Sequence, residues 1–203
     1  GECGGKDCSL HRLKEGSRRV RPEFLEFCVQ QILERTDRSE GLVYASLGCG
    51  CLYFDWELLD RLVHSEGVRV TEAWLVEDYG MEFQINRRAQ AAFASWFAGT
   101  GMTVRCFRST ESLGDWVRVL PSGDQAHVLM ECDSDFLADE VAQEALMRPG
   151  GIHVILAQDN DVLTGLYPVR KLIQRDAEDP AKFEVLESKS WRDGSWVDWK
   201  EPV

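Results

Sequence analysis

The sequence lacks any apolar run of the roughly 20 residues that a membrane-spanning helix needs, and it contains no internal repeat or low-complexity tract. Only 6 of its 203 residues are proline, and no linker divides the chain. We therefore expect no membrane span and one main domain with an appendage. Residues 1–40 are predicted to form an N-terminal arm and helix, and residues 41–203 an α/β domain.

Basic side chains are also scarce, with 23 Lys and Arg against 35 Asp and Glu and a formal net charge of −12. The acidic excess lies in residues 41–203, which disfavours binding to nucleic acid because that domain repels phosphate. Residues 11–21 are locally basic and are interpreted as a solvated arm, one of two candidate surfaces for protein partners. The C-terminal hairpin described below is the other.

The seven cysteines give no disulfide framework, because their number is odd and the chain is too long to need covalent staples. This use of cysteine favours an intracellular, reducing compartment. Cys3, Cys8 and His11 have a spacing that resembles the start of a zinc site, but no complete fourth ligand follows nearby. We therefore expect no metal.

Apolar strand-like segments alternate with helical patterns along most of the chain. The sequence predicts strands near residues 41–47, 68–76, 102–107, 126–130 and 152–157. Helices are predicted near residues 22–36, 55–64, 83–97, 136–147 and 166–173. Nearly continuous apolar strands that alternate with helices are typical of a mainly parallel sheet covered on both faces.

The C-terminus predicts a β-hairpin instead, because Asp193-Gly194 lies between two strand-like runs. A two-residue turn at these positions would place Trp191 opposite Trp196. In the same register, Lys189 would lie opposite Asp198. We expect this hairpin at the edge of the sheet.

The first predicted strand ends in Gly48-Cys49-Gly50, and the second ends in Glu77-Asp78. Glycines allow the close approach of a ligand, and a carboxylate at the end of the second strand can accept both hydroxyls of a ribose. Together they indicate a cofactor that contains a nucleoside. A nicotinamide-dependent oxidoreductase is disfavoured, because Tyr53 stands where the dinucleotide motif has its third glycine.

At these residues the chain resembles the class I S-adenosylmethionine-dependent methyltransferases, a Rossmann-like family. The resemblance covers residues 41–203 as an order of elements. Three short segments support the resemblance at the level of residues: the turn at residues 47–50, Glu77-Asp78, and the acidic end of the fourth strand at residues 131–133. It implies a doubly wound, mainly parallel sheet of seven strands in the order 3-2-1-4-5-7-6, with helices on both faces. The family commonly has an acidic residue where Ser46 stands here.

The resemblance implies S-adenosylmethionine as the cofactor and a small molecule or a protein side chain as the methyl acceptor. It also implies two groups of site residues. The candidate cofactor-binding residues are Ser46, Gly48, Cys49, Gly50, Glu77 and Asp78. The candidate catalytic residues are Glu131 and Asp133, which would orient the nucleophile or receive its proton. The alternative is a non-catalytic methyltransferase-like domain that serves as a structural or interaction subunit of a larger assembly.

Overall fold

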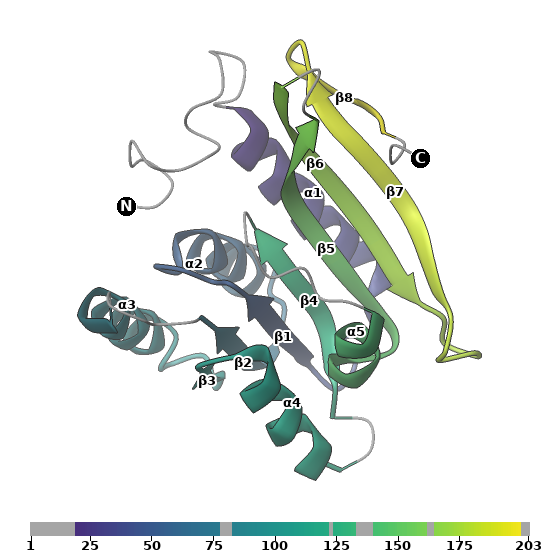
Figure 1. Ribbon diagram of the computed structural model, residues 1–203. Coiled ribbons are helices and arrows are strands. Elements are labelled where there is room, and N and C mark those ends of the chain that lie inside the picture. The colour runs from purple at the N-terminus through teal and green to yellow at the C-terminus, as the bar shows by residue number, and fades with distance from the viewer. Residues whose placement is uncertain (1–18, 78–82, 122–123, 133–139, 162–164, 200–203) are drawn as a thin grey trace.

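A computed structural model describes residues 19–77, 83–121, 124–132, 140–161 and 165–199 (Figure 1). Cys3, Cys8 and His11, whose spacing resembles the start of a zinc site, therefore lie outside the described residues. The elements in chain order are α1 (Val20–Arg35), β1 (Leu42–Leu47), α2 (Tyr53–Asp60), the π-helical turn η3 (Arg61–Ser65), β2 (Val70–Val76), α3 (Phe83–Trp96), β3 (Thr103–Phe107), α4 (Thr110–Val119), β4 (Ala126–Cys132), α5 (Glu140–Leu146), β5 (Met147–Asp161), β6 (Gly165–Arg175), β7 (Phe183–Arg192) and β8 (Ser195–Asp198).

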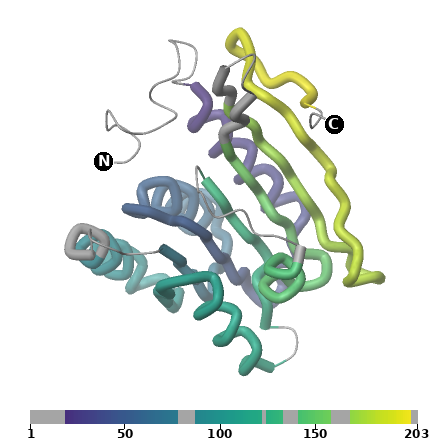
Figure 2. Tube along the Cα trace, viewed as in Figure 1, coloured from purple at the N-terminus to yellow at the C-terminus, as the bar shows by residue number. Residues whose placement is uncertain are grey.

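The strands form one sheet in the order β3-β2-β1-β4-β5-β6-β7-β8. The first five strands pair in parallel, and β5 to β8 pair antiparallel in chain order. This confirms the predicted α/β class, with a mainly parallel first part and a C-terminal hairpin. The predicted strand count and order are wrong in the last part, where eight strands replace seven and β5-β6-β7-β8 replaces 5-7-6. Figure 2 shows these antiparallel strands on the side of the molecule away from α3.

The difference arises at residues 166–173, which were predicted to be helical and instead lie in β6. Apolar spacing alone did not distinguish a helix from a strand here. Val169 and Ile173 are β-branched, which favours a strand. The strand is also central, since it pairs with β5 on one side and with β7 on the other, so both ladders satisfy its backbone groups. Without a crossover helix, β6 must return antiparallel to β5.

Helices cover the two faces of the sheet in separate groups (Figure 1). One face packs against α1, α2 and α3 in the larger apolar cluster, which includes Phe24, Leu58 and Phe93. The other face packs against α4 and α5 in a second cluster, which includes Leu113 and Leu146. The parallel strands therefore have apolar side chains on both faces, as their near-continuous apolar sequences predict.

Helix α4 was not predicted from the sequence. Ser109 and Ser112 form a capping box in which each side chain hydrogen-bonds the other residue's backbone N–H group. Leu113 and Val117 follow at helical spacing and are buried. The capping box and this helical spacing are the features of the sequence that indicate a helix here. They occur in a segment rich in charged residues, where the apolar pattern is short.

The hairpin register is as predicted. Asp193-Gly194 forms the turn, and both residues have positive φ, at 49° and 83°, as a type I′ turn requires. Trp191 pairs with Trp196 and Lys189 pairs with Asp198. The two indole rings lie edge to face with their centroids 5.2 Å apart. Strand β8 is at the edge of the sheet, also as predicted.

Among the described residues, no helix combines the length and the apolar character that crossing a membrane requires.

Candidate functional site

The turn after β1 has the conformation that its glycines favour. Gly48 and Gly50 have φ values of 67° and 51°, in the left-handed region where a β-carbon is strained. Leu52 is also left-handed at 67°, and α2 begins at the next residue. This confirms that the two glycines form the turn from the first strand into the following helix. The turn lies at the carboxyl end of the parallel strands, where α/β folds bind ligands.

Glu77 lies directly against this turn, although it is 27 residues further along the chain. Its Oε2 accepts a hydrogen bond of 2.6 Å from the Gly50 N–H group. The Cys49 N–H group donates to the carbonyl oxygen of Val76 at 3.0 Å. The structure thus brings together two of the predicted features, the glycine turn and the carboxylate after the second strand. Asp78 lies outside the described residues.

Ser46 and Cys49 are both buried, Ser46 in β1 and Cys49 in the turn. The side chain of Ser46 shares a face of β1 with Tyr44, because the two residues are two positions apart in a strand. That face belongs to the apolar cluster formed with α1 and α2. Ser46 therefore lies beneath the turn, on the α1 and α2 side of the sheet.

A buried pair beneath the turn was missed by sequence reasoning. The Tyr44 hydroxyl donates a 2.6 Å hydrogen bond to Oδ1 of Asp55 in the first turn of α2. Tyr44 is fully buried and Asp55 is only 3% exposed. Burial, followed by the adjacent Asp55 carboxylate, raises the pKa of Tyr44 well above its ordinary value, while hydrogen bonding by Ser46 opposes this. The phenol is therefore neutral and is the donor.

Glu131 is buried, whereas its predicted catalytic role requires contact with the methyl acceptor. Its backbone pairs with Leu47, immediately before the glycine turn. Its side chain is 1% exposed and lies on the face of the sheet covered by α4 and α5, because Met130 before it faces the α1 side. Its Oε1 lies 3.0 Å from Nε2 of His153 in β5, which is completely buried. Asp133, the other candidate catalytic residue, lies outside the described residues.

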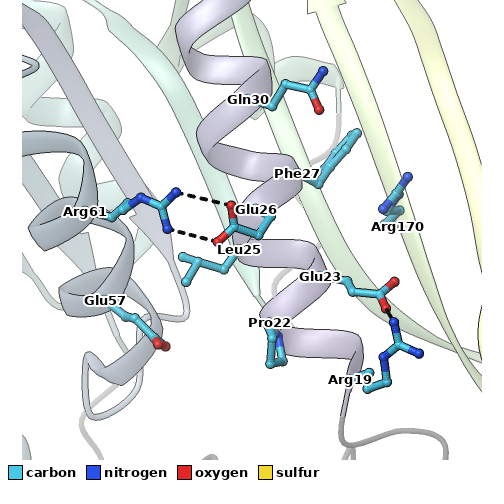
Figure 3. A pocket seen from close by; sticks show the side chains of 10 residues that line it. All are labelled: Arg19, Pro22, Glu23, Leu25, Glu26, Phe27, Gln30, Glu57, Arg61 and Arg170. Atoms are coloured by element: carbon cyan, nitrogen blue, oxygen red, sulfur yellow. Dashed lines mark hydrogen bonds and ion pairs between the residues drawn. The ribbon is translucent and has the colours of Figure 1, made fainter. Parts of the chain in front are cut away.

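A groove of about 620 Å³ runs along the outer side of α1 (Figure 3). Its charged side chains are largely paired with each other, since Arg61 forms two hydrogen bonds with Glu26 and Arg19 forms an ion pair with Glu23. Neither the glycine turn nor Glu77 lines it. We therefore place the candidate cofactor site at the turn and not in this groove.

No protein-family model and no curated protein sequence matches the chain. Solved structures do match its fold. One, from Plasmodium falciparum, is named as a protein-L-isoaspartate O-methyltransferase in complex with S-adenosyl-L-homocysteine. It has a TM-score of 0.52 at 9% identity, over 90% of this chain and 74% of that one. The DszA carbon methyltransferase gives a TM-score of 0.53 at 12% identity, over 75% of this chain and 38% of that one.

The CMeT domain of the citrinin polyketide synthase has a TM-score of 0.47 at 15% identity, over 72% of this chain. The chain spans 37% of that structure. It therefore covers less than half of the CMeT domain structure and of the DszA structure. The likeness to the first two structures shows that the chain has the fold of the class I methyltransferases.

Proposed function

We propose that the chain binds S-adenosylmethionine at the turn after β1 and transfers its methyl group to a small molecule or a protein side chain. The observation that carries this proposal is the hydrogen bond from the Gly50 N–H group to Glu77. It joins a left-handed glycine turn and a carboxylate at the carboxyl ends of two adjacent parallel strands. That combination suits a ligand with a ribose and a charged amino-acid end.

Each candidate residue has a distinct role in this proposal. Gly48, Cys49 and Gly50 let the methionine end of the cofactor approach the backbone of the turn closely, and Ser46 supports the turn from below. The carboxylate of Glu77, or that of Asp78, accepts the ribose hydroxyls. Glu77 uses one carboxylate oxygen for Gly50, which fixes the carboxylate against the turn. When bound, the cofactor supplies an electrophilic methyl group on a sulfonium.

On the acceptor side, we propose that Glu131 or Asp133 orients the nucleophile or takes its proton. Methyl transfer is an in-line displacement, so positioning of the two reactants supplies much of the rate. Oε1 of Glu131 lies 3.0 Å from Nε2 of His153, so a second buried side chain restricts the position of the Glu131 carboxyl group.

The proposal is tested by calorimetry with two variants at the turn. Gly48→Val places a β-branched side chain at a left-handed position and should abolish binding of S-adenosylmethionine. Glu77→Ala should weaken binding by about 1–3 kcal/mol, the scale of a charge-assisted hydrogen bond. Gly99→Val and Glu184→Ala are matched controls away from the turn. Unchanged affinity in both turn variants would place the cofactor site elsewhere.

Two observations favour the second candidate function, a non-catalytic methyltransferase-like subunit. Glu131 is almost fully buried, and the antiparallel strands end in a hairpin where Val197 is 40% exposed. Such a domain would contact protein partners through the N-terminal arm or this hairpin. Absence of binding to both S-adenosylmethionine and S-adenosylhomocysteine at millimolar concentration would favour this function over the first.

A further inference from the structure

Two neighbouring helices, α2 and α3, present aromatic rings to solvent (Figure 1). Tyr53 and Trp56 are one helical turn apart on α2, and Trp96 is the last residue of α3. Among the Phe, Tyr and Trp side chains that the structure describes, these three are the exposed ones, at 53%, 37% and 55%. Exposed rings that gather at one place, rather than singly, indicate a binding surface.

The rings of Trp56 and Trp96 meet at a corner. Their centroids are 5.6 Å apart and their planes differ by 74°. The indole Nε1–H group of Trp96 donates a 2.8 Å hydrogen bond to Oδ1 of Asp60, the last residue of α2. This bond orients the Trp96 ring and holds a carboxylate beside it. We call Trp56, Trp96 and Asp60 the aromatic corner.

The charges at the aromatic corner favour a cation. Oδ2 of Asp60 has no hydrogen-bond partner among the residues that the structure describes, and His64, the other contact of Asp60, lies 3.9 Å from Oδ1. The guanidinium of the next residue, Arg61, is occupied by Glu26 and Glu66. The face of an aromatic ring is also partly negative. A cation at the corner would therefore contact ring faces and lie near a carboxylate.

We propose that the aromatic corner binds a quaternary ammonium group, either free, as in choline, or on a trimethyllysine side chain. A tetrahedral cation can contact two ring faces that stand at 74° to each other, whereas a planar guanidinium can lie flat on only one of them. A primary ammonium is more strongly hydrated and loses more on leaving water. The inference does not depend on the proposed function, because no residue of the corner is assigned to the cofactor.

The first test compares choline with 3,3-dimethylbutanol, the neutral alcohol in which carbon replaces the choline nitrogen. Binding to the full chain is followed by NMR of the indole N–H signals of Trp56 and Trp96. Choline should shift both signals along a saturable curve in the millimolar range, and the neutral alcohol should bind at least about tenfold more weakly. A trimethyllysine peptide that binds more tightly than choline supports a protein side chain as the source, and the reverse order supports a small molecule.

Variants separate a cation site from an apolar surface. Trp96→Leu keeps an apolar side chain but removes a ring face, and should weaken choline by about 3- to 30-fold at the Trp56 signal. Asp60→Asn removes the negative charge and should weaken choline but not the neutral alcohol. It decides the question if Trp96→Leu does not fold. Trp199→Leu, beyond β8, is the matched control and should leave choline binding unchanged.

Three results would overturn the inference. Equal binding of choline and the neutral alcohol would make the corner an apolar surface without preference for charge. No shift of either indole signal with choline or with the trimethyllysine peptide would exclude the site. A parent protein that is a dimer, and that Trp96→Leu converts to a monomer, would show that a second copy of the chain covers the rings.

Discussion

Arg170 in β6 contacts helix α1 near the N-terminus and both strands of the C-terminal hairpin, β7 and β8. Its guanidinium lies 4.1 Å from the ring centre of Phe27 in α1 and 4.6 Å from that of Trp196 in β8. Its Nε donates a 2.6 Å hydrogen bond to Glu187 in β7. Arg170 is itself in β6 and buried. We predict that Arg170→Met destabilises the packing of α1 on the antiparallel strands.

The magnitude follows from the contacts that are lost. Each cation–π contact contributes about 0.5–2 kcal/mol, and the charged hydrogen bond about 1.5–3 kcal/mol. The methionine side chain keeps part of the apolar packing. Glu187 retains an ion pair with Lys189 at 3.3 Å, which reduces the cost of leaving its charge behind. We expect the free energy of unfolding to fall by about 2–4 kcal/mol, below a simple sum of the terms.

Urea denaturation measures this change, with Arg170→Lys as the second variant. Lysine keeps the charge but loses the planar stacking, so it should cost about 1–2 kcal/mol. The double variant Arg170→Met/Glu187→Leu should recover part of the loss, because it also removes the carboxylate that has lost its hydrogen bond from Arg170. If the free energy of unfolding of Arg170→Met lies within about 0.5 kcal/mol of the parent value, this account is refuted, because an ordinary surface substitution changes stability by that much.

Two further predictions concern stability. Gly151→Ala should cost about 1–3 kcal/mol in urea denaturation, because a β-carbon there would lie 2.7 Å from Cγ of Met147; Gly99→Ala, which meets no atom within 4 Å, is the control and should change little. Burial lowers the pKa of His127 to about 4, below the value near 6.5 of the unfolded chain. The unfolded chain therefore takes up the proton first, and thermal stability should fall as the pH drops from about 6.5 to 4. His127→Asn keeps an acceptor for the Val43 N–H group and should flatten that dependence; an equal slope in both proteins would contradict it.

Local turn chemistry made several parts of the structure predictable. Asp193-Gly194 fixed the hairpin register because a two-residue turn leaves one pairing for the flanking strands. The two glycines after β1 predicted the turn because their left-handed backbone suits no other residue as well. The alternation of apolar strands with helices predicted the parallel part of the sheet and its two covered faces.

The remaining features depend on contacts between distant segments. Residues 166–173 have apolar positions that fit both a helix and a strand, and pairing with two neighbouring strands decides between them. Asp55 is recognisable from sequence as an acid near a helix start, but its burial against Tyr44 depends on how α2 packs over β1. The contact of Glu131 with His153 likewise requires the order of β4 and β5. The roles of Asp78 and Asp133 stay predictions.

The central claim is that the turn after β1 and Glu77 form a binding site for S-adenosylmethionine. Isothermal titration of the full chain with S-adenosylmethionine tests this claim most directly. The account predicts saturable 1:1 binding in the micromolar range, lost in Gly48→Val and retained in Gly99→Val. No heat of binding at millimolar cofactor in the folded parent protein, or equal binding by the two variants, would contradict it.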